Sequence, residues 1–252
     1  MAIFTDDKDI SLMRESGKRL HAVIQKVAAA VRPGVTTSEL DDLARKLIEK
    51  DGDIPVFLRY QPFGASYPYP ASLCVSVNDE VVHGIPGVRV LKEGDIVGLD
   101  LGLAHGSRIT DSAVTVPVGR VSPEHEKLIR ITRESLMAGI KAAKVGGYVN
   151  DIGKAVEAYV KPYGYGIVRI LAGHGVGKKV HEDPYVPNYD SGKRGEKLKE
   201  GMVLALEPMI NEGTEDVILD DDGYTFKTAD GKYSAHFEHT ILLKKSGPEI
   251  LT

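Results

Sequence analysis

The sequence predicts an α+β fold in which residues 1–252 form one domain of two similar halves, at about 1–118 and 119–252. Each half begins with a long helical pattern and then a shorter one, and Leu91-Lys92-Glu93-Gly94 recurs as Leu198-Lys199-Glu200-Gly201. An apolar strand pattern follows each copy of this tetrapeptide. Repetition of the same order of elements indicates a duplicated unit, and helices with one apolar face pack on a sheet. We therefore expect a sheet covered by helices, with its halves related by a pseudo-two-fold axis.

The composition is that of an ordinary globular protein. The 252 residues are 42% apolar, which is enough for a sizeable core. A net charge of −4 and a pI near 6.1 provide no basic surface for nucleic acid. No stretch approaches the roughly 18 apolar residues of a membrane span, and charges over 6–9 stand where an export signal would be apolar. Cys74 is the only cysteine, so an internal disulfide is excluded and a reducing, cytoplasmic setting is expected.

Helices are predicted at the start of each half. Apolar residues at helical spacing predict a helix over 7–31, and Thr36-Thr37-Ser38-Glu39 has the spacing of a capping box that begins a second helix. This second helix should end before Gly52, because glycine commonly follows a helix. In the second half, a helix is predicted over 122–144 and a shorter one to about residue 161.

Two acidic residues interrupt the strand patterns of the first half. Short strands are predicted over 72–77 and 81–87, and a longer apolar strand over 95–104 contains Asp100. The chain then reverses, and the returning strand contains Asp111. A carboxylate in an apolar strand is costly to bury unless it is paired or bound to a cation, and two on adjoining strands repel each other. One divalent metal ion, or two, would explain both residues.

The second half contains matching residues. In the register of the repeated tetrapeptide, Asp100 corresponds to Glu207, and His83 has a counterpart in His181. Taken alone, His83 is more typical of an incidental histidine near a strand end. A duplicated unit would bring matching acidic residues together at its pseudo-two-fold axis, and we therefore expect a site there.

One glycine-rich segment, 173–184, places His174 and His181 seven residues apart around three alternating glycines. Glycines suit a backbone that must pass close to something bound. Neutral imidazole is the commonest metal ligand and also a ready acid or base. The segment therefore indicates a metal ligand and a proton carrier, and a glycine-rich turn with two surface histidines is the alternative.

A strand predicted over 234–243 adds Glu238 and completes a set of candidate metal ligands. The set is Asp100, Asp111, His174, Glu207 and Glu238. Four carboxylates carry too much negative charge for one structural zinc ion, which favours a cage of cysteine and histidine. Two divalent ions bridged by carboxylates fit better. Metal ions lower the pKa of a bound water to about 7 in favourable cases and polarise the carbonyl that it attacks, so hydrolysis is the expected chemistry.

Five motifs give the chain a resemblance to a known enzyme family. They are Asn78-Asp79-Glu80-Val81-Val82-His83-Gly84-Ile85-Pro86, Asp100 with Asp111 eleven residues later, Gly173-His174-Gly175-Val176-Gly177 with His181-Glu182-Asp183-Pro184, Leu206-Glu207-Pro208-Met209, and Phe237-Glu238-His239-Thr240. With these motifs in this order, the chain resembles the type I methionine aminopeptidases over nearly its whole length. The resemblance implies the pita-bread fold, with a curved antiparallel sheet covered by helices.

The resemblance also implies how the candidate ligands act. Asp111 and Glu238 would bridge two divalent ions, which could be Co, Mn, Fe or Zn. Asp100 would complete the coordination of one ion, and His174 with Glu207 that of the other. Glu207 would also handle the proton of the bridging water.

Two histidines, His83 and His181, are implied to act on the substrate and not on the metal. They would contact the scissile amide and stabilise the tetrahedral intermediate, as donors aimed where charge develops. The implied reaction removes the N-terminal methionine of new proteins whose second residue is small. Nascent polypeptide N-termini are thus the expected partners, and a monomer without membrane or nucleic-acid partners is expected.

The residues expected to contact the methionine depart from the family pattern. Val180 replaces a phenylalanine, Tyr224 replaces a tryptophan, and Tyr69 lies in 53–70, an aromatic and proline-rich loop expected to line a pocket. The resemblance places Cys74 near this pocket, with a small apolar strand residue as the alternative. Further departures are Gly102 in place of threonine and His236 in place of glutamine. The smaller Val180 removes contact area, an effect on the order of 1 to 3 kcal/mol in discrimination.

Two alternative functions stay open. The first is a related pita-bread peptidase of different specificity, such as an Xaa-Pro peptidase, which the motif Phe237-Glu238-His239-Thr240 argues against. The second is a non-catalytic binding protein on the same scaffold. Five intact ligands argue against it, because a binding protein has no need of four mutually repelling carboxylates. A ribosome contact through the polar loop 188–200 is a further hypothesis.

Overall fold

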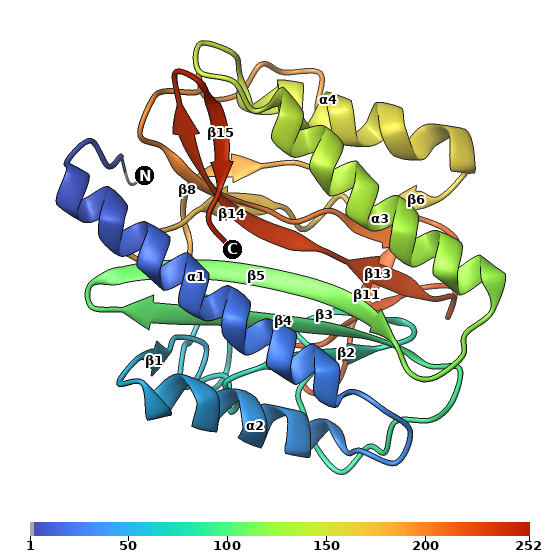
Figure 1. Ribbon diagram of the computed structural model, residues 1–252. Coiled ribbons are helices and arrows are strands. Elements are labelled where there is room, and N and C mark those ends of the chain that lie inside the picture. Colours follow the sequence, from blue (N-terminus) through green and yellow to red (C-terminus); the bar gives the residue numbers. More distant parts are fainter. Residues whose placement is uncertain (1–2) are drawn as a thin grey trace.

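Four α-helices pack on one face of a curved antiparallel sheet in the computed structural model, which describes residues 3–252 (Figure 1). The helices are α1 (Asp7–Ala30), α2 (Thr37–Lys50), α3 (Pro123–Ala142) and α4 (Val149–Val160), with a short 3₁₀ helix, η1 (Lys161–Tyr163), after the last. Within the described residues, none of the helices has the length and apolarity that crossing a membrane requires. The predicted α+β class is confirmed.

The helix starts follow local capping chemistry. The Asp6 side chain accepts hydrogen bonds from the backbone N–H groups of Lys8 and Asp9 and begins α1. Thr36 and Glu39 form the predicted capping box at the start of α2. The helices expected from the sequence are therefore confirmed, with ends that move by only a few residues.

A nine-stranded sheet forms the centre of the molecule, in the order β1-β4-β5-β14-β9-β7-β8, with β2 beside β4 and β15 beside β14. Its strands are β1 (Ile54–Pro55), β2 (Cys74–Val77), β4 (Ile96–His105), β5 (Arg108–Pro117), β7 (Gly173–Gly175), β8 (Glu182–Val186), β9 (Val203–Leu206), β14 (Glu238–Lys244) and β15 (Gly247–Ile250). Its strands pair in antiparallel fashion. Strands from the two halves of the chain meet where β5 pairs with β14.

Two three-stranded sheets, in the orders β13-β10-β6 and β11-β12-β3, complete the fold. Their strands are β3 (Glu80–Val82), β6 (Gly166–Ile167), β10 (Met209–Asn211), β11 (Val217–Leu219), β12 (Phe226–Thr228) and β13 (Ser234–His236). The single strand predicted over 234–243 is wrong, because Phe237 separates β13 from β14. The strands that pair with them, β10 and β9, are also separated at this level, between Leu206 and Met209. Pro208 lies there and has no N–H to donate to a ladder.

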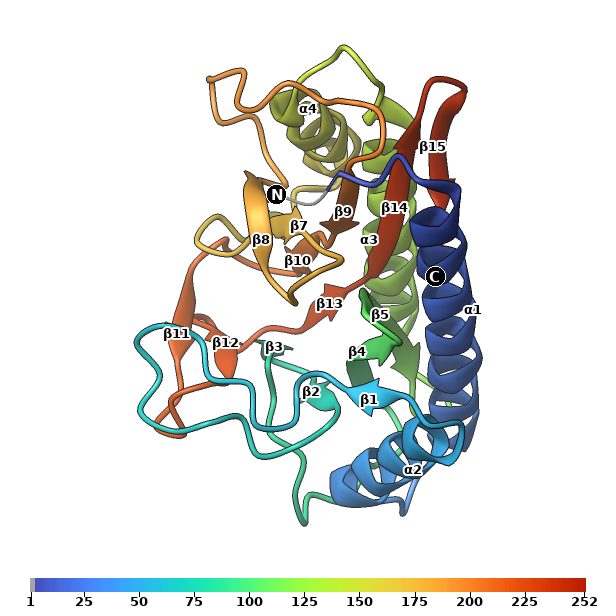
Figure 2. The same cartoon turned by 90° about the vertical axis from the view of Figure 1, so that its left-hand side faces the viewer.

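Alternation along β4 separates the core from the opposite face of the sheet. Leu99, Leu101 and Leu103 are fully buried and pack in one cluster with Leu20 of α1 and Leu40 of α2. Successive side chains of a strand point to opposite faces, so the residues between these leucines point away from the helices. Figure 2 shows α1 and α3 on one side of the central strands, with β11 and β12 on the other. The candidate site lies on the side away from the helices.

Candidate metal centre and substrate cavity

Strand register brings the acidic residues of the first half onto one face. Residues that pair directly across two strands point to the same side, as do residues two apart on one strand. Asp100 pairs with Ala113, which is two residues from Asp111, and Ala113 also pairs with Glu238 of β14. The side chains of all three carboxylates therefore project from the face that the helices leave free.

The second half adds its ligands by the same rule. His174 of β7 pairs with Ala205 of β9, and Ala205 pairs with Thr240, two residues beyond Glu238. Glu207 follows Ala205 by two residues, just beyond the end of β9. The candidate ligands thus come from five adjacent strands or their ends, which explains why residues so distant in sequence meet.

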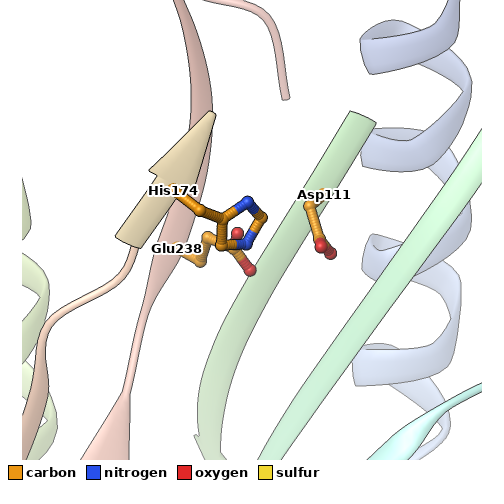
Figure 3. A group of neighbouring side chains, drawn as sticks. All are labelled: Asp111, His174 and Glu238. Carbon is orange, nitrogen blue, oxygen red and sulfur yellow. The ribbon is translucent and has the colours of Figure 1, made fainter. Parts of the chain in front are cut away.

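Asp111, His174 and Glu238 form a group that could hold a metal ion, because each offers one ligand atom within 4.8 Å of the others. Figure 3 shows these three side chains projecting from separate strands into one space. Glu207 adjoins the group, with Oε1 lying 3.4 Å from Nε2 of His174. Nδ1 of His174 lies 2.9 Å from the carbonyl oxygen of Gly175. Donation from Nδ1–H to that carbonyl leaves Nε2 with a free lone pair, as a metal ligand requires.

The electrostatics of these residues fit a bound cation. Burial, followed by repulsion from neighbouring acids, raises the pKa of Asp100, Glu207 and Glu238 well above the usual range. Burial also raises the pKa of Asp111 to about 7. Among the described residues, buried Oδ1 of Asp100 and Oε1 of Glu238 have no hydrogen-bond partner. A divalent cation would satisfy both oxygens and offset the repulsion, so the residues fit a divalent metal centre.

His83 and His181 lie beside the ligands as neutral rings. Burial lowers the pKa of His83 to about 4 and also lowers the pKa of His181. The backbone of His83 has a φ of 62°, in the left-handed region that few residues other than glycine adopt. Such strain is concentrated at functional sites. The His181 ring meets the His174 ring edge-on, with centroids 4.5 Å apart.

A cavity of about 120 Å³ adjoins the ligands. Its wall away from the ligands consists of Phe57, Tyr60, Pro62, Tyr69, Cys74 and Tyr224. A wider groove of about 620 Å³ meets the cavity at His83, His174, His181 and Glu207. The cavity is therefore a small, largely apolar side pocket of a larger groove. The candidate ligands His174 and Glu207 stand where the two meet, and the other three line the cavity.

Three of the four residues predicted only for substrate binding line the cavity, and the fourth does not. Tyr69, Cys74 and Tyr224 line the cavity, whereas Val180 does not. Val180 is 6% exposed and packs in the same apolar cluster as Phe57, Tyr69 and Tyr224. The loop over 53–70 does line the cavity, as its composition predicted. Phe57, Tyr60 and Pro62 of this loop line the cavity beside Tyr69, although the sequence singled out only Tyr69 as a substrate contact.

Two departures from the family pattern also lie at this site. Gly102 pairs with Asp111 across β4 and β5, and Phe57 occupies the space that a side chain at position 102 would take. His236 is 3% exposed, and its Nε2 lies 3.8 Å from Oε2 of Glu207. Both positions therefore shape the surroundings of candidate ligands.

Two of the alternating glycines of segment 173–177 have a role in the fold. A Cβ atom on Gly173 would lie 2.4 Å from the carbonyl oxygen of Ala205, and one on Gly175 would lie 2.1 Å from that of Asp183. These glycines allow β7 to pass close to the backbone on either side. Gly173 also lines the wider groove, so the expectation that these glycines face something bound stays a prediction.

Residues 11–245 match the model of metallopeptidase family M24. The chain belongs to this family, and the predicted enzyme class, a metal-dependent peptidase, is confirmed. Within the family it is similar to methionine aminopeptidases. That of Clostridium perfringens is 48% identical over 252 residues, which cover 100% of this chain and 99% of the relative. The predicted resemblance is therefore confirmed.

Solved structures agree with these relatives. The crystal structure of methionine aminopeptidase from Rickettsia prowazekii matches with a TM-score of 0.95 and 38% identity, over 100% of this chain and 99% of that one. The pita-bread fold implied by the resemblance is confirmed. The prolidase from Pyrococcus furiosus matches with a TM-score of 0.77 and 22% identity, over 99% of this chain and 65% of that one. At that identity the likeness concerns the fold alone.

Proposed function

We propose that the chain removes the N-terminal methionine from polypeptides whose second residue is small. The observation that carries this proposal is the position of the candidate ligands: all five line a small apolar cavity, and His174 with Glu207 lie where it joins a wider groove. The cavity suits one apolar side chain, and the groove leaves room for the rest of a polypeptide. Cleavage at their junction would release a single terminal residue.

The candidate ligands have distinct proposed roles. Two divalent ions would be held by these residues: Asp111 and Glu238 would contribute to both, Asp100 to one, and His174 with Glu207 to the other. When bound, such ions lower the pKa of a water molecule and polarise the scissile carbonyl. Glu207 accepts the proton of the attacking water at a carboxylate oxygen. Its place where the cavity joins the groove supports this role.

The histidines and the apolar wall hold the substrate. His83 and His181 each have one N–H when neutral, and they donate it to the scissile amide, where negative charge develops. Tyr69, Cys74 and Tyr224 contact the methionine side chain. A thioether packs favourably against aromatic rings, which suits this wall.

The domain organisation and the cellular partners are also part of the proposed function. Residues 1–252 act as one catalytic domain with half-repeats at about 1–118 and 119–252, which the matching orders α1, α2 and α3, α4 support. Nascent polypeptide N-termini in the cytoplasm are the substrates. The exposed Lys193 and Arg194 in the loop 188–200 contact the ribosome. Ribosome binding that survives Lys193→Glu with Arg194→Glu would remove this last element.

Peptide cleavage tests the proposed reaction. Protein stripped of metal by a chelator is mixed with Met-Ala-Ser, and Mn, Fe or Co is added back. We expect metal-dependent release of methionine from this peptide and none from Met-Leu-Ser. Cleavage of an Ala-Pro peptide alone would establish the Xaa-Pro alternative. Metal binding without cleavage of any peptide would favour a binding protein.

A further inference from the structure

Tyr60 contacts one of the two histidines that face the substrate. Its hydroxyl oxygen lies 2.8 Å from Nδ1 of His181, and the ring centroids are 5.3 Å apart. The two residues are 121 positions apart in the sequence, so the contact depends on the tertiary fold. Tyr60 also lines the cavity, and it thus stands beside both the substrate wall and a candidate catalytic group.

Backbone hydrogen bonds hold Tyr60 in place independently of His181. Its N–H donates to the carbonyl of Phe57 at 2.9 Å, and its carbonyl accepts from the N–H of Tyr69 at 2.8 Å. The Tyr69 hydroxyl in turn donates to the carbonyl of Gly84 at 2.9 Å. The loop therefore holds the backbone of Tyr60 independently of His181, and the Tyr60 side chain reaches the His181 ring from this fixed backbone.

The direction of this hydrogen bond follows from acid and base strength. A phenol is a stronger acid than the N–H of neutral imidazole, and an imidazole nitrogen is a stronger base than a phenol oxygen. Tyr60 therefore donates and Nδ1 accepts, so the single ring proton of His181 resides on Nε2.

We propose that Tyr60 is a positioning residue that fixes the tautomer of His181 with the proton on Nε2. His181 then presents an N–H donor at the junction of cavity and groove, as stabilisation of a developing oxyanion requires. The opposite tautomer would present a lone pair and repel that charge. This inference rests on the proposed peptidase function, because it concerns how His181 contributes to that reaction.

The substitution Tyr60→Phe keeps the ring and removes the hydroxyl. We expect kcat to fall by about 10- to 100-fold, as for other partners that orient a catalytic group, with KM and metal stoichiometry nearly unchanged. Tyr67→Phe is the matched control, because Tyr67 lies in the same loop. Its hydroxyl donates a hydrogen bond to the carbonyl of Asp222 at 2.5 Å, and the substitution removes that bond. Similar losses in the two variants would show that a looser loop is the cause, and would overturn the positioning role.

Nitrogen-15 NMR of histidine-labelled, metal-free protein reads the tautomer directly, with His181→Asn used to assign the signals. We expect the proton of His181 on Nε2 in the wild type and a mixture of tautomers in Tyr60→Phe. A proton on Nδ1 in the wild type would overturn the inference, as would Tyr60→Phe with normal kcat. Failure of the proposed function would appear differently, as a wild type that releases no methionine while the spectrum still reports the tautomer.

Discussion

The two walls of the cavity are built in opposite ways. Asp100, Asp111 and Glu238 project from paired central strands, whose ladder fixes their separation. Tyr60 and Tyr69 project from a loop between β1 and β2 that a few hydrogen bonds hold, such as those joining the two tyrosines to their neighbours. Metal chemistry requires ligands at set distances, which a sheet provides, whereas a loop can change its residues without disturbing the ligands. We call the first side the strand wall (Asp100, Asp111 and Glu238) and the second the loop wall (Tyr60 and Tyr69). The proposed function places the metal chemistry on the strand wall and the methionine specificity on the loop wall.

The largest effect is expected for the strand wall. Asp111→Asn or Glu238→Gln should remove a bridging carboxylate and abolish turnover. Loss of the several kcal/mol that metal ions supply to a transition state corresponds to roughly 10³-fold or more in rate. Methionine release and metal content should fall together. Glu49→Gln, an exposed carboxylate on α2, is the control and should change neither.

A smaller effect is expected for His181, which lies between the two walls. His181→Ala should lower kcat by about 10²- to 10³-fold, as removal of one oxyanion donor does, with metal content intact. Kinetics and metal analysis on the same preparation measure both quantities. A His181→Ala protein of normal activity would remove the role assigned to this residue. Loss of metal from this variant would show that His181 helps to hold the metal.

The walls touch at Gly102, which allows a test of whether they are independent. A Cβ atom there would lie 2.6 Å from Cγ2 of Val56 and 2.8 Å from Cε1 of Phe57. Gly102→Ala should therefore lower the free energy of unfolding by about 1 to 3 kcal/mol, as overpacking does. It should also lower kcat/KM, because Phe57 is displaced into the cavity. Gly98→Ala on the same strand is the control, since its nearest neighbouring atom would lie at 3.6 Å.

The double variant Gly102→Ala with Phe57→Leu sharpens this test. The smaller side chain relieves part of the crowding, so the combined loss of stability should be less than the sum of the single losses. Chemical denaturation of the four proteins measures this coupling. Additive losses would mean that Phe57 does not respond to position 102, and that the two walls are independent.

The strand wall could be predicted from the sequence because its residues break a strong local rule. A carboxylate such as Asp100 inside an apolar strand calls for a cation, and the repeated tetrapeptide indicated Glu207 as its counterpart. The helices could be predicted for a similar reason, since the capping box at Thr36 is local chemistry. Such signals lie within a few residues and need no knowledge of the fold.

The loop wall could not be predicted in the same way. The contact between Tyr60 and His181 joins positions that no local rule connects, and only the path of the loop brings them together. The interruption at Phe237 between β13 and β14 likewise depends on the neighbouring strands, because Pro208 lies between β9 and β10 at the same level. Composition indicated that the loop would line a pocket, but the choice of residues depends on tertiary packing.

The smallest expected effect is on the free energy of unfolding of the metal-free protein, in which the carboxylates of the strand wall lie close together without a cation. Burial raises the pKa of Asp111 to about 7 and of Asp100 and Glu238 well above their usual range, against about 4 in an unfolded chain. The folded state then binds more protons than the unfolded state, so this contribution favours folding at low pH and is lost as pH rises. Histidines oppose it at lower pH, because burial lowers the pKa of His83 to about 4 and of His174 to about 3.

Above about pH 7.5 histidines are almost entirely neutral in both states, and the carboxylate contribution dominates. We therefore expect the stability of chelator-stripped protein to fall by about 1 kcal/mol or more between about pH 7.5 and pH 8.5. Mn-loaded protein should show no such fall, since a cation that binds the ionised carboxylates stabilises the folded state. Thermal unfolding of both forms across this range measures the difference. A stripped protein that becomes more stable as pH rises here would show that the strand wall is not under electrostatic strain, and that the ligands need no cation to coexist.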